Sequence, residues 1–173
     1  CRCGQRVALS LLGCMQCRVI AMSKGNPSRQ LGWRLCVKRT FDCATALGAL
    51  LLLLPLLLLV AALILMTMGS PVLFLQVRPG KYGRKFTLVK FRTMKNVRDA
   101  AGRFLPDSER LTRLGRWLRA CSVDELPQLW NVVKGEMSLV GPRPLLIQYL
   151  ERYTAEQARR HDVLPGITGW AQI

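Results

Sequence analysis

The sequence contains few acidic residues and one histidine. Its 10 Asp and Glu face 26 Lys and Arg, which gives a formal charge of +16 at pH 7 over 173 residues. A single histidine is more often a surface or helix-end residue than a general base, so His161 is left out of the candidate site. The sequence also lacks a P-loop, a dinucleotide-binding glycine fingerprint and a Ser/His/Asp arrangement. The classes of enzyme that depend on those motifs are therefore excluded.

The seven cysteines form no even set on which to build a disulfide framework. Most of them lie in the N-terminal segment, where Cys1-x-Cys3 and Cys14-x-x-Cys17 have spacings that allow a metal site. Free thiols in an unstructured segment are the simpler interpretation. Residues 1–33 are basic and show no periodic pattern, so we expect them to form a disordered leader.

One long segment lacks charge altogether. From Cys43 to Met68 every residue is uncharged and most are apolar. As a straight helix this segment would be about 39 Å long, enough to cross a hydrocarbon core of about 30 Å. Pro55 lies in its middle and predicts a break or kink, because proline lacks the N–H of a helical hydrogen bond. Each half alone would reach only about 20 Å.

The charges that flank this segment favour a re-entrant helix. Lys and Arg outnumber Asp and Glu on both sides, whereas a single-pass helix usually has its basic excess on the cytoplasmic side alone. We therefore expect residues 34–70 to form a helix-break-helix, with the break at Pro55, that dips into one leaflet and returns. A proline-kinked single-pass helix is the alternative.

Residues 71–173 predict a small interfacial domain. Apolar residues in 72–77 and 86–91, with the turn Pro79-Gly80-Lys81-Tyr82-Gly83 between them, predict a β-hairpin. A basic amphipathic helix is expected over 110–119, a pattern that suits either a bilayer interface or an ordinary solvated surface. The expected fold class is thus α+β, mainly α, with a re-entrant helix, a short hairpin and interfacial helices around a small core.

Three further helices are expected in this domain. The first covers residues 124–134 and ends at Gly135, which serves as a C-terminal stop. The second covers residues 144–153. The third covers residues 155–161, where Thr154 and Gln157 have the spacing of a capping box.

The excess of positive charge indicates an anionic partner. Nucleic acid is one candidate, and an anionic membrane with phosphorylated substrates is the other. The sequence has no interleaved aromatic platform and no DNA-reading helix motif, and it carries a long apolar segment. We therefore expect membrane lipid and phosphates as partners, and no nucleic acid.

Asp124 and Glu125 are an adjacent acidic pair in a strongly basic surrounding. A helix N-terminus and nearby arginines would lower the pKa of both carboxyl groups, which favours two ionised groups side by side. One carboxylate would then meet a substrate phosphorus while the other holds a metal. The alternative is structural, because Ser122-x-x-Glu125 also matches a capping box.

Gly141-Pro142-Arg143-Pro144 strengthens the catalytic interpretation. Pro142 and Pro144 fix the backbone on both sides of Arg143, and a rigidly held guanidinium suits phosphate recognition. A proline-rich turn with a solvated arginine is the alternative. Arg92, in Lys90-Phe91-Arg92-Thr93, is a further candidate for binding phosphate.

Several longer motifs follow one another in order along the chain. They are Lys38-Arg39-x-Phe41-Asp42, the run over 69–80, the stretch over 90–94, Thr112-Arg113-x-Gly115-Arg116-x-Leu118-Arg119, Ser122-x-Asp124-Glu125-Leu126-Pro127-Gln128, the run over 135–144 and the run over 165–172. In these motifs residues 34–173 resemble the bacterial sugar transferase family, the monotopic polyprenyl-phosphate phosphoglycosyl transferases. Leu54-Pro55 departs from the Ser-Pro pair that commonly marks the family's membrane break.

The resemblance implies a two-step transfer on the cytoplasmic face of the bacterial inner membrane. Asp124 would attack the β-phosphorus of a UDP-sugar and release UMP, and undecaprenyl phosphate would then take up the phosphosugar. Glu125 would hold Mg²⁺. Because both substrates are anions, neutralising charge is also expected from arginines, namely Arg116, Arg119 and Arg143. The product would begin the assembly of an exopolysaccharide, an O-antigen or a glycoprotein glycan.

Two further expectations concern the C-terminal end of the domain and a rival function. The resemblance implies that the catalytic domain continues beyond residue 173, so we expect this chain to be truncated at its C-terminus. The rival function is a non-catalytic membrane adaptor that binds anionic lipids through its Arg-rich helix. The sequence leaves the sugar, the glycan pathway and the oligomeric state open.

Overall fold

The computed structural model describes residues 32–169, so the expected leader lies almost wholly outside the described residues. The described part is mainly helical, as expected, and it contains two small two-stranded sheets, of which the sequence predicted the first. Its order is α2 (Gly32–Met68), β1 (Leu73–Pro79), η1 (Lys81–Gly83), β2 (Lys85–Phe91), α3 (Asp107–Arg110), α4 (Arg113–Ala120), η2 (Val123–Gln128), α5 (Leu129–Lys134), β3 (Ser138–Val140), η3 (Ile147–Arg152), α6 (Ala155–Ala158), η4 (Arg159–Asp162) and β4 (Gly166–Thr168).

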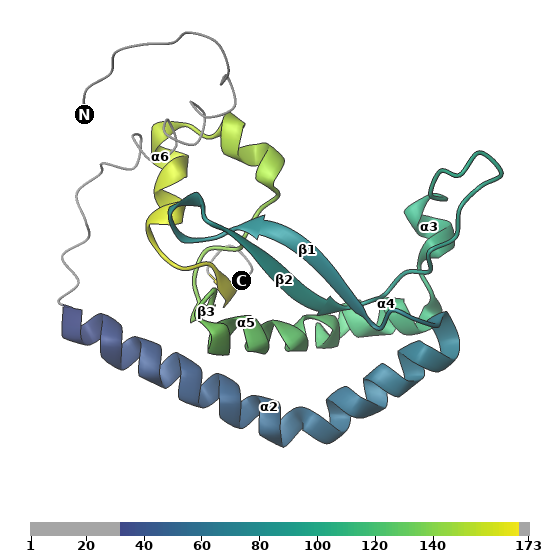
Figure 1. The fold of residues 1–173 in the computed structure, drawn as a ribbon, viewed down its shortest axis with the longest axis horizontal. Helices are drawn as coiled ribbons and strands as arrows, with labels where there is room; N and C mark the ends of the chain where they lie inside the picture. Colours follow the sequence, from purple (N-terminus) through teal and green to yellow (C-terminus); the bar gives the residue numbers. More distant parts are fainter. Residues whose placement is uncertain (1–31, 170–173) are drawn as a thin grey trace, which may run out of the picture.

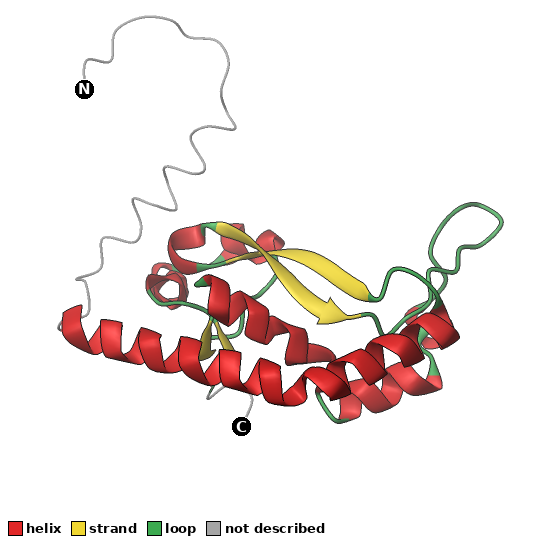
Figure 2. Ribbon diagram, turned by 60° about the horizontal axis from the view of Figure 1, so that its bottom comes forward, coloured by secondary structure: helices red, strands yellow, loops and turns green. Residues whose placement is uncertain are grey.

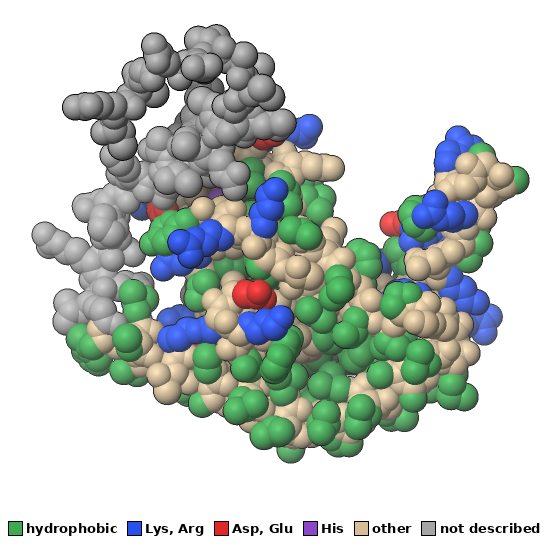
Figure 3. Space-filling view, viewed as in Figure 1, with side chains coloured by type: hydrophobic (Ala, Val, Ile, Leu, Met, Phe, Trp, Pro, Cys, Tyr) green, Lys and Arg blue, Asp and Glu red, His purple; other side chains and the backbone are tan. Residues whose placement is uncertain are grey.

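Helix α2 is long and apolar enough to cross a membrane, by length and composition. It bends near its middle, close to Pro55, and its concave side faces the rest of the described chain (Figure 1). Helical structure continues through Pro55, so the two expected halves form one bent helix without an interruption. Only 11% of its most apolar window is buried by protein, and its outer face is covered with hydrophobic side chains (Figure 3). This face suits contact with lipid.

The N-terminal half of α2 packs against α5. Ala46 lies in a core cluster with residues from β2 and α5. The guanidinium of Arg39 donates to the carbonyls of Val132 and Met137, at 2.5 and 2.8 Å. Asp42 is buried and accepts a hydrogen bond from Ser138 at 2.7 Å. Polar contacts therefore fix this half of the helix to the domain.

The C-terminal half of α2 packs against β2 and α4. Val60 and Ile64 form a core cluster with Phe91 and Leu118. Beyond the cluster, Arg92 donates to the carbonyls of the last helical residue and of the two residues after it, Met68, Gly69 and Ser70. Because the last carbonyls of a helix have no partner within it, Arg92 caps this end.

The expected hairpin is present, with β1 and β2 antiparallel and Leu73 opposite Phe91. Its position on α5 depends on Asn131, which is fully buried. The amide nitrogen of Asn131 donates to the Thr87 carbonyl at 2.7 Å, and its oxygen accepts from the Val89 N–H at 3.2 Å. Figure 2 shows the hairpin above a row of helices that runs alongside α2.

The expected helix over 124–134 is two elements. Residues 123–128 form the 3₁₀ helix η2, and the α-helix begins only at Leu129. Pro127 explains the difference, because its ring nitrogen has no hydrogen to donate to the carbonyl four residues back. Ser122 is left-handed, with φ 55°, and its side chain makes no capping bond, so the alternative capping box is absent. Gly135, at φ 93°, ends α5 as expected.

The C-terminal part contains a sheet that the sequence did not predict. Strands β3 and β4 are parallel, with Ser138 opposite Gly166 and Val140 opposite Thr168. The expected helix over 144–153 is the 3₁₀ helix η3, and the expected helix over 155–161 is α6 followed by η4. The capping box of Thr154 and Gln157 is confirmed.

Candidate functional site

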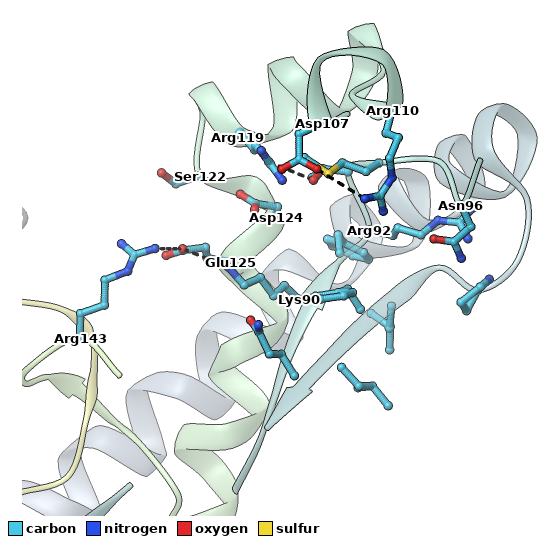
Figure 4. Close-up of a pocket in the computed structure, with 18 residues that line it drawn as sticks. Lys90, Arg92, Asn96, Asp107, Arg110, Arg119, Ser122, Asp124, Glu125 and Arg143 are labelled. Atoms are coloured by element: carbon cyan, nitrogen blue, oxygen red, sulfur yellow. Dashed lines mark hydrogen bonds and ion pairs between the residues drawn. The ribbon is translucent and has the colours of Figure 1, made fainter. Parts of the chain in front are cut away.

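A cavity of about 950 Å³ lies between the hairpin and the helices α3, α4 and η2 (Figure 4). One wall is apolar and comes from the start of β1, with Leu73, Phe74 and Leu75. The other walls carry charged and polar side chains, namely Lys90, Arg92, Thr93, Asn96, Asp107, Arg110, Arg119, Ser122, Asp124, Glu125 and Arg143. Five of the six expected substrate residues, all except Arg116, therefore line this cavity or a smaller one beside it, as do both carboxylates.

Asp124 is 7% exposed and lies on η2 at the cavity wall. Burial raises the pKa of its carboxyl group, and the neighbouring Glu125 raises it further. Lys90 and Arg119 oppose that rise, together with a backbone hydrogen bond. The sequence-based expectation of a lowered pKa is wrong for Asp124, because desolvation outweighs the nearby cations. Its ionised form is thus poorly solvated.

Glu125 lies in a different environment although it is the next residue. Its Oε1 accepts a hydrogen bond from Nη2 of Arg143 at 2.7 Å and lies 3.9 Å from Nζ of Lys90. Arg143 reaches Glu125 from a loop between Pro142 and Pro144, and both prolines line small cavities beside this loop. The structure therefore brings Glu125 and Arg143 into contact, although the sequence motifs indicated them separately.

Arg119 is placed by a close contact between backbones. A Cβ on Gly115 would overlap the carbonyl of Thr93, so α4 lies directly against the chain after β2. One turn later, Nε of Arg119 donates to the hydroxyl of Thr93 at 3.0 Å. Arg116 is exposed and is not among the residues that line the cavity. Its expected role in phosphate binding stays a prediction.

Arg92 lines the cavity and is 5% exposed. Both of its terminal nitrogens donate to carbonyls at the end of α2. The observed contacts of Arg92 therefore fasten the end of α2 to the wall of the cavity. Phosphate binding by Arg92 stays a prediction.

Sequence reasoning missed Lys90 as a site residue. In β2 the buried residues Phe86 and Leu88 alternate with exposed ones, and Lys90 continues the inward-facing series. A lysine at an inward position is rarely buried without a partner, which is a signal that could have found it. Burial lowers the pKa of Lys90, while Glu125 and Asp124 raise it. Asn96, Asp107 and Arg110, at the far rim, gave no such signal.

The side chains at the site suit Mg²⁺ better than a metal ion whose ligands all come from the protein. Within residues 32–169 no group of three or more His, Cys, Asp or Glu side chains is close enough to hold a metal ion. Mg²⁺ is usually held by one or two carboxylates, with phosphate and water oxygens completing its octahedron. Asp124 and Glu125 fit that requirement.

The family model for bacterial sugar transferases matches residues 33–173. Uncharacterized sugar transferase EpsL of Bacillus subtilis is 56% identical over 139 residues, which cover 80% of this chain and 69% of that protein. Undecaprenyl-phosphate glucose phosphotransferase of Komagataeibacter xylinus is 48% identical over 154 residues, covering 82% of this chain. UDP-N-acetylgalactosamine-undecaprenyl-phosphate N-acetylgalactosaminephosphotransferase of Aeromonas hydrophila is 43% identical over 142 residues, covering 79% of this chain.

The relatives differ in length. The matched region spans only 28% of the Komagataeibacter protein and 34% of the Aeromonas protein. The family model nevertheless covers the bent helix, the hairpin and the site that carries Asp124 and Glu125. By these matches the chain belongs to the bacterial sugar transferase family.

Proposed function

We propose that this chain transfers a phosphosugar from a UDP-sugar to undecaprenyl phosphate, with Asp124 as the nucleophile. The observation that carries the proposal is the contrast between two adjacent carboxylates. Asp124 is buried at the cavity wall, whereas Glu125 is bound by Arg143. A carboxylate that burial deprives of water is the more reactive one toward phosphorus. The names of relatives, which include several undecaprenyl-phosphate sugar transferases, support the same substrates.

The proposed chemistry has two balanced steps. A carboxylate oxygen of Asp124 attacks the β-phosphorus, the bond from that phosphorus to the bridging oxygen breaks, and UMP leaves with the bridging oxygen. A phosphate oxygen of the lipid then attacks the same phosphorus, and the Asp124 carboxylate leaves. Lys90, Arg119 and Arg143 surround the site with positive charge, which offsets the repulsion between anions.

The two walls of the cavity suit two different substrates. The apolar residues Leu73, Phe74 and Leu75 begin five residues after the end of α2, so a lipid chain would reach the cavity from the membrane side. The polar residues at the opposite rim suit a nucleotide-sugar that arrives from water. We propose that Glu125 holds Mg²⁺, which would neutralise charge on the phosphates when bound.

We also propose that α2 is re-entrant and enters a single leaflet. Arg39 near one end and Arg92 at the other both connect the helix to the same small domain. If α2 crossed the bilayer, one of these contacts would have to form on the opposite side of the membrane. The bend near Pro55 directs both halves toward the domain and supports this placement (Figure 1).

The transfer is tested by UMP release from a panel of UDP-sugars, with undecaprenyl phosphate, Mg²⁺ and the chain in nanodiscs. We expect Asp124→Asn to lose turnover by about a thousandfold or more, since no covalent intermediate forms. Glu109→Gln, which changes an exposed acid that is not among the residues lining the cavity, is the matched control and should retain most turnover. Undiminished UMP release by Asp124→Asn would overturn the assignment of the nucleophile.

The metal is tested separately. Chelation should stop UMP release and Mg²⁺ should restore it, and Glu125→Gln should raise the Mg²⁺ concentration needed for half-maximal turnover. An unchanged Mg²⁺ requirement in Glu125→Gln would count against Glu125 as a ligand.

The topology is tested with single-cysteine variants that retain either Cys36 or Cys121, both exposed in the structure. A membrane-impermeant maleimide should label both from the cytoplasmic side if α2 is re-entrant. Labelling of the two cysteines from opposite sides would establish a spanning helix instead.

A further inference from the structure

His161 is the one histidine of the chain, and the proposed chemistry leaves it without a role. It lies in η4 and is only 9% exposed, so it is buried beyond what a surface residue at a helix end would be. Its Nδ1 lies 3.2 Å from the carbonyl oxygen of Gly80, in the turn of the hairpin. Its Nε2 is buried and has no hydrogen-bond partner among the described residues.

The contact with Gly80 determines which nitrogen carries the proton. A carbonyl oxygen only accepts, so Nδ1 must be the donor. In a neutral ring Nε2 then carries a lone pair and no hydrogen. A buried acceptor without a partner costs less than a buried N–H donor without one. The neutral Nδ1–H tautomer is therefore the form that this environment fits.

His161 also lines a small cavity together with the loop that carries Arg143. A cavity of about 10 Å³ is bounded by three segments that are distant in the sequence. They are the hairpin turn with Gly80, the loop over 142–144, and the segment over 160–165 that contains His161. The ring of Tyr153 packs against His161, with the two ring centroids 5.5 Å apart.

Backbone hydrogen bonds continue from this segment to the arginine. The N–H of Gly166 donates to the carbonyl of Pro142 at 3.1 Å, and the N–H of Gly141 donates to Thr168 at 2.9 Å. Neither Gly141 nor Gly166 has room for a Cβ, because the two backbones are in contact. A shift of the segment after His161 would therefore move the Arg143 loop, and with it the 2.7 Å contact between Arg143 and Glu125.

We propose that His161 is a positioning residue, whose neutral ring fastens the hairpin turn to the segment that holds the Arg143 loop in place. The role in turnover rests on the transferase function proposed above. The structural role does not, because it concerns contacts among residues of this chain alone. His161 touches no substrate in this account and acts through Arg143.

The charges around the ring agree with a neutral histidine. Burial lowers the pKa of His161, and Arg160 lowers it further, while the Gly80 carbonyl and Asp162 act in the opposite direction. Arg143 lines the same small cavity and adds positive charge. Below this lowered pKa the ring would gain a buried N–H at Nε2 and a charge between cations. Acid should therefore loosen the contact between η4 and the hairpin turn.

The first experiment reads the ring directly, because a chain with one histidine gives one imidazole signal. The full chain without an affinity tag of histidines is labelled with ¹⁵N-histidine in nanodiscs and titrated by NMR. We expect the Nδ1–H tautomer at neutral pH and a pKa below the ordinary value of His. An Nε2–H tautomer, or titration at or above the ordinary value, would overturn the proposal.

The second experiment compares His161→Asn with His161→Phe. Asparagine places an N–H near the position of Nδ1, whereas phenylalanine keeps a ring and loses the donor. We expect His161→Phe to lose about tenfold or more in kcat/KM, because a small misplacement of a substrate-binding group is costly. His161→Asn should recover most of that loss. Tyr153→Phe, which keeps the neighbouring ring, is the control and should match the parent chain.

The outcomes separate this proposal from the proposed function. Equal losses in His161→Asn and His161→Phe, or full activity in a folded His161→Phe, would refute the positioning role. If the parent chain releases no UMP, the transferase proposal fails. In that case the positioning role of His161 is tested by the ¹⁵N signal of the Arg143 guanidinium. This signal should shift in His161→Phe and stay unchanged in His161→Asn and Tyr153→Phe.

Discussion

The two ends of α2 are attached to the domain in opposite ways. At the N-terminal end the helix supplies the side chain, because Arg39 reaches the backbone carbonyls of Val132 and Met137. At the C-terminal end the domain supplies the side chain, because Arg92 reaches the carbonyl of the last helical residue and those of the two residues after it. Arg92 is also part of the cavity wall, whereas Arg39 is not among its lining residues. Helix α2 is therefore part of the fold, and its C-terminal end is connected to the site.

The largest loss of stability is expected from Arg92→Ala. It leaves three carbonyls at the end of α2 without their charged donor, so we expect a loss of about 3 kcal/mol in the free energy of unfolding, together with reduced turnover. Thermal unfolding in nanodiscs, followed by circular dichroism, measures the first effect. Arg113→Ala, at an exposed position of α4, is the control. Unchanged stability would show that the cap contributes little.

Arg39→Ala is expected to cost less, about 2 kcal/mol, because it frees two carbonyls and the position is partly solvated. It should change turnover less than Arg92→Ala does at equal loss of stability. The ratio of turnover to folded fraction, measured for both variants, tests the difference between the ends. Equal ratios would show that the two ends of α2 do not differ in their connection to the site.

Gly135→Ala should destabilise by about 1 kcal/mol, since alanine is strained at φ 93°. A Cβ there would also lie 3.1 Å from Nη2 of Arg39. We therefore expect the double variant with Arg39→Ala to lose less stability than the sum of the two single changes. Additive losses in denaturant unfolding would mean that the two residues do not interact.

The smallest change in stability is expected from Asp124→Asn, which alters the cavity without touching either end of α2. Because burial raises the pKa of Asp124 in the folded state, its ionised form opposes folding. The uncharged asparagine should therefore make the chain slightly more stable at neutral pH. This advantage should disappear as the pH falls through the raised pKa, where the parent carboxyl group is protonated as well. A stability difference that is independent of pH would contradict this origin.

The sequence predicted those features that depend on local pattern. The apolar segment with Pro55, the hairpin and the stop at Gly135 follow from periodicity and from the properties of proline and glycine. The acidic pair and Arg143 were found because their residue types are unusual in their context. The 3₁₀ form of η2 was predictable from Pro127 and was missed.

Other features depend on contacts that no local pattern reveals. Strands β3 and β4 have three residues each and pair across a long stretch of chain, so neither has a clear alternation. The burial of Asp124 arises from the packing of η2 on β2, and its pKa could not be inferred from neighbouring charges in the sequence. The contact of Arg92 with the end of α2 joins residues that are 22 to 24 positions apart.

The contact of Gly115 with Thr93 has a consequence for attempts to alter the enzyme. The distance between α4 and the end of β2 is set by the missing side chain of one residue. Any substitution of Gly115 would widen this gap and carry Arg119 away from the cavity, even though Gly115 bears no functional group. Libraries that aim to change the accepted sugar should therefore leave Gly115 constant and vary the far rim, where Asn96 of a loop and Asp107 of α3 line the cavity.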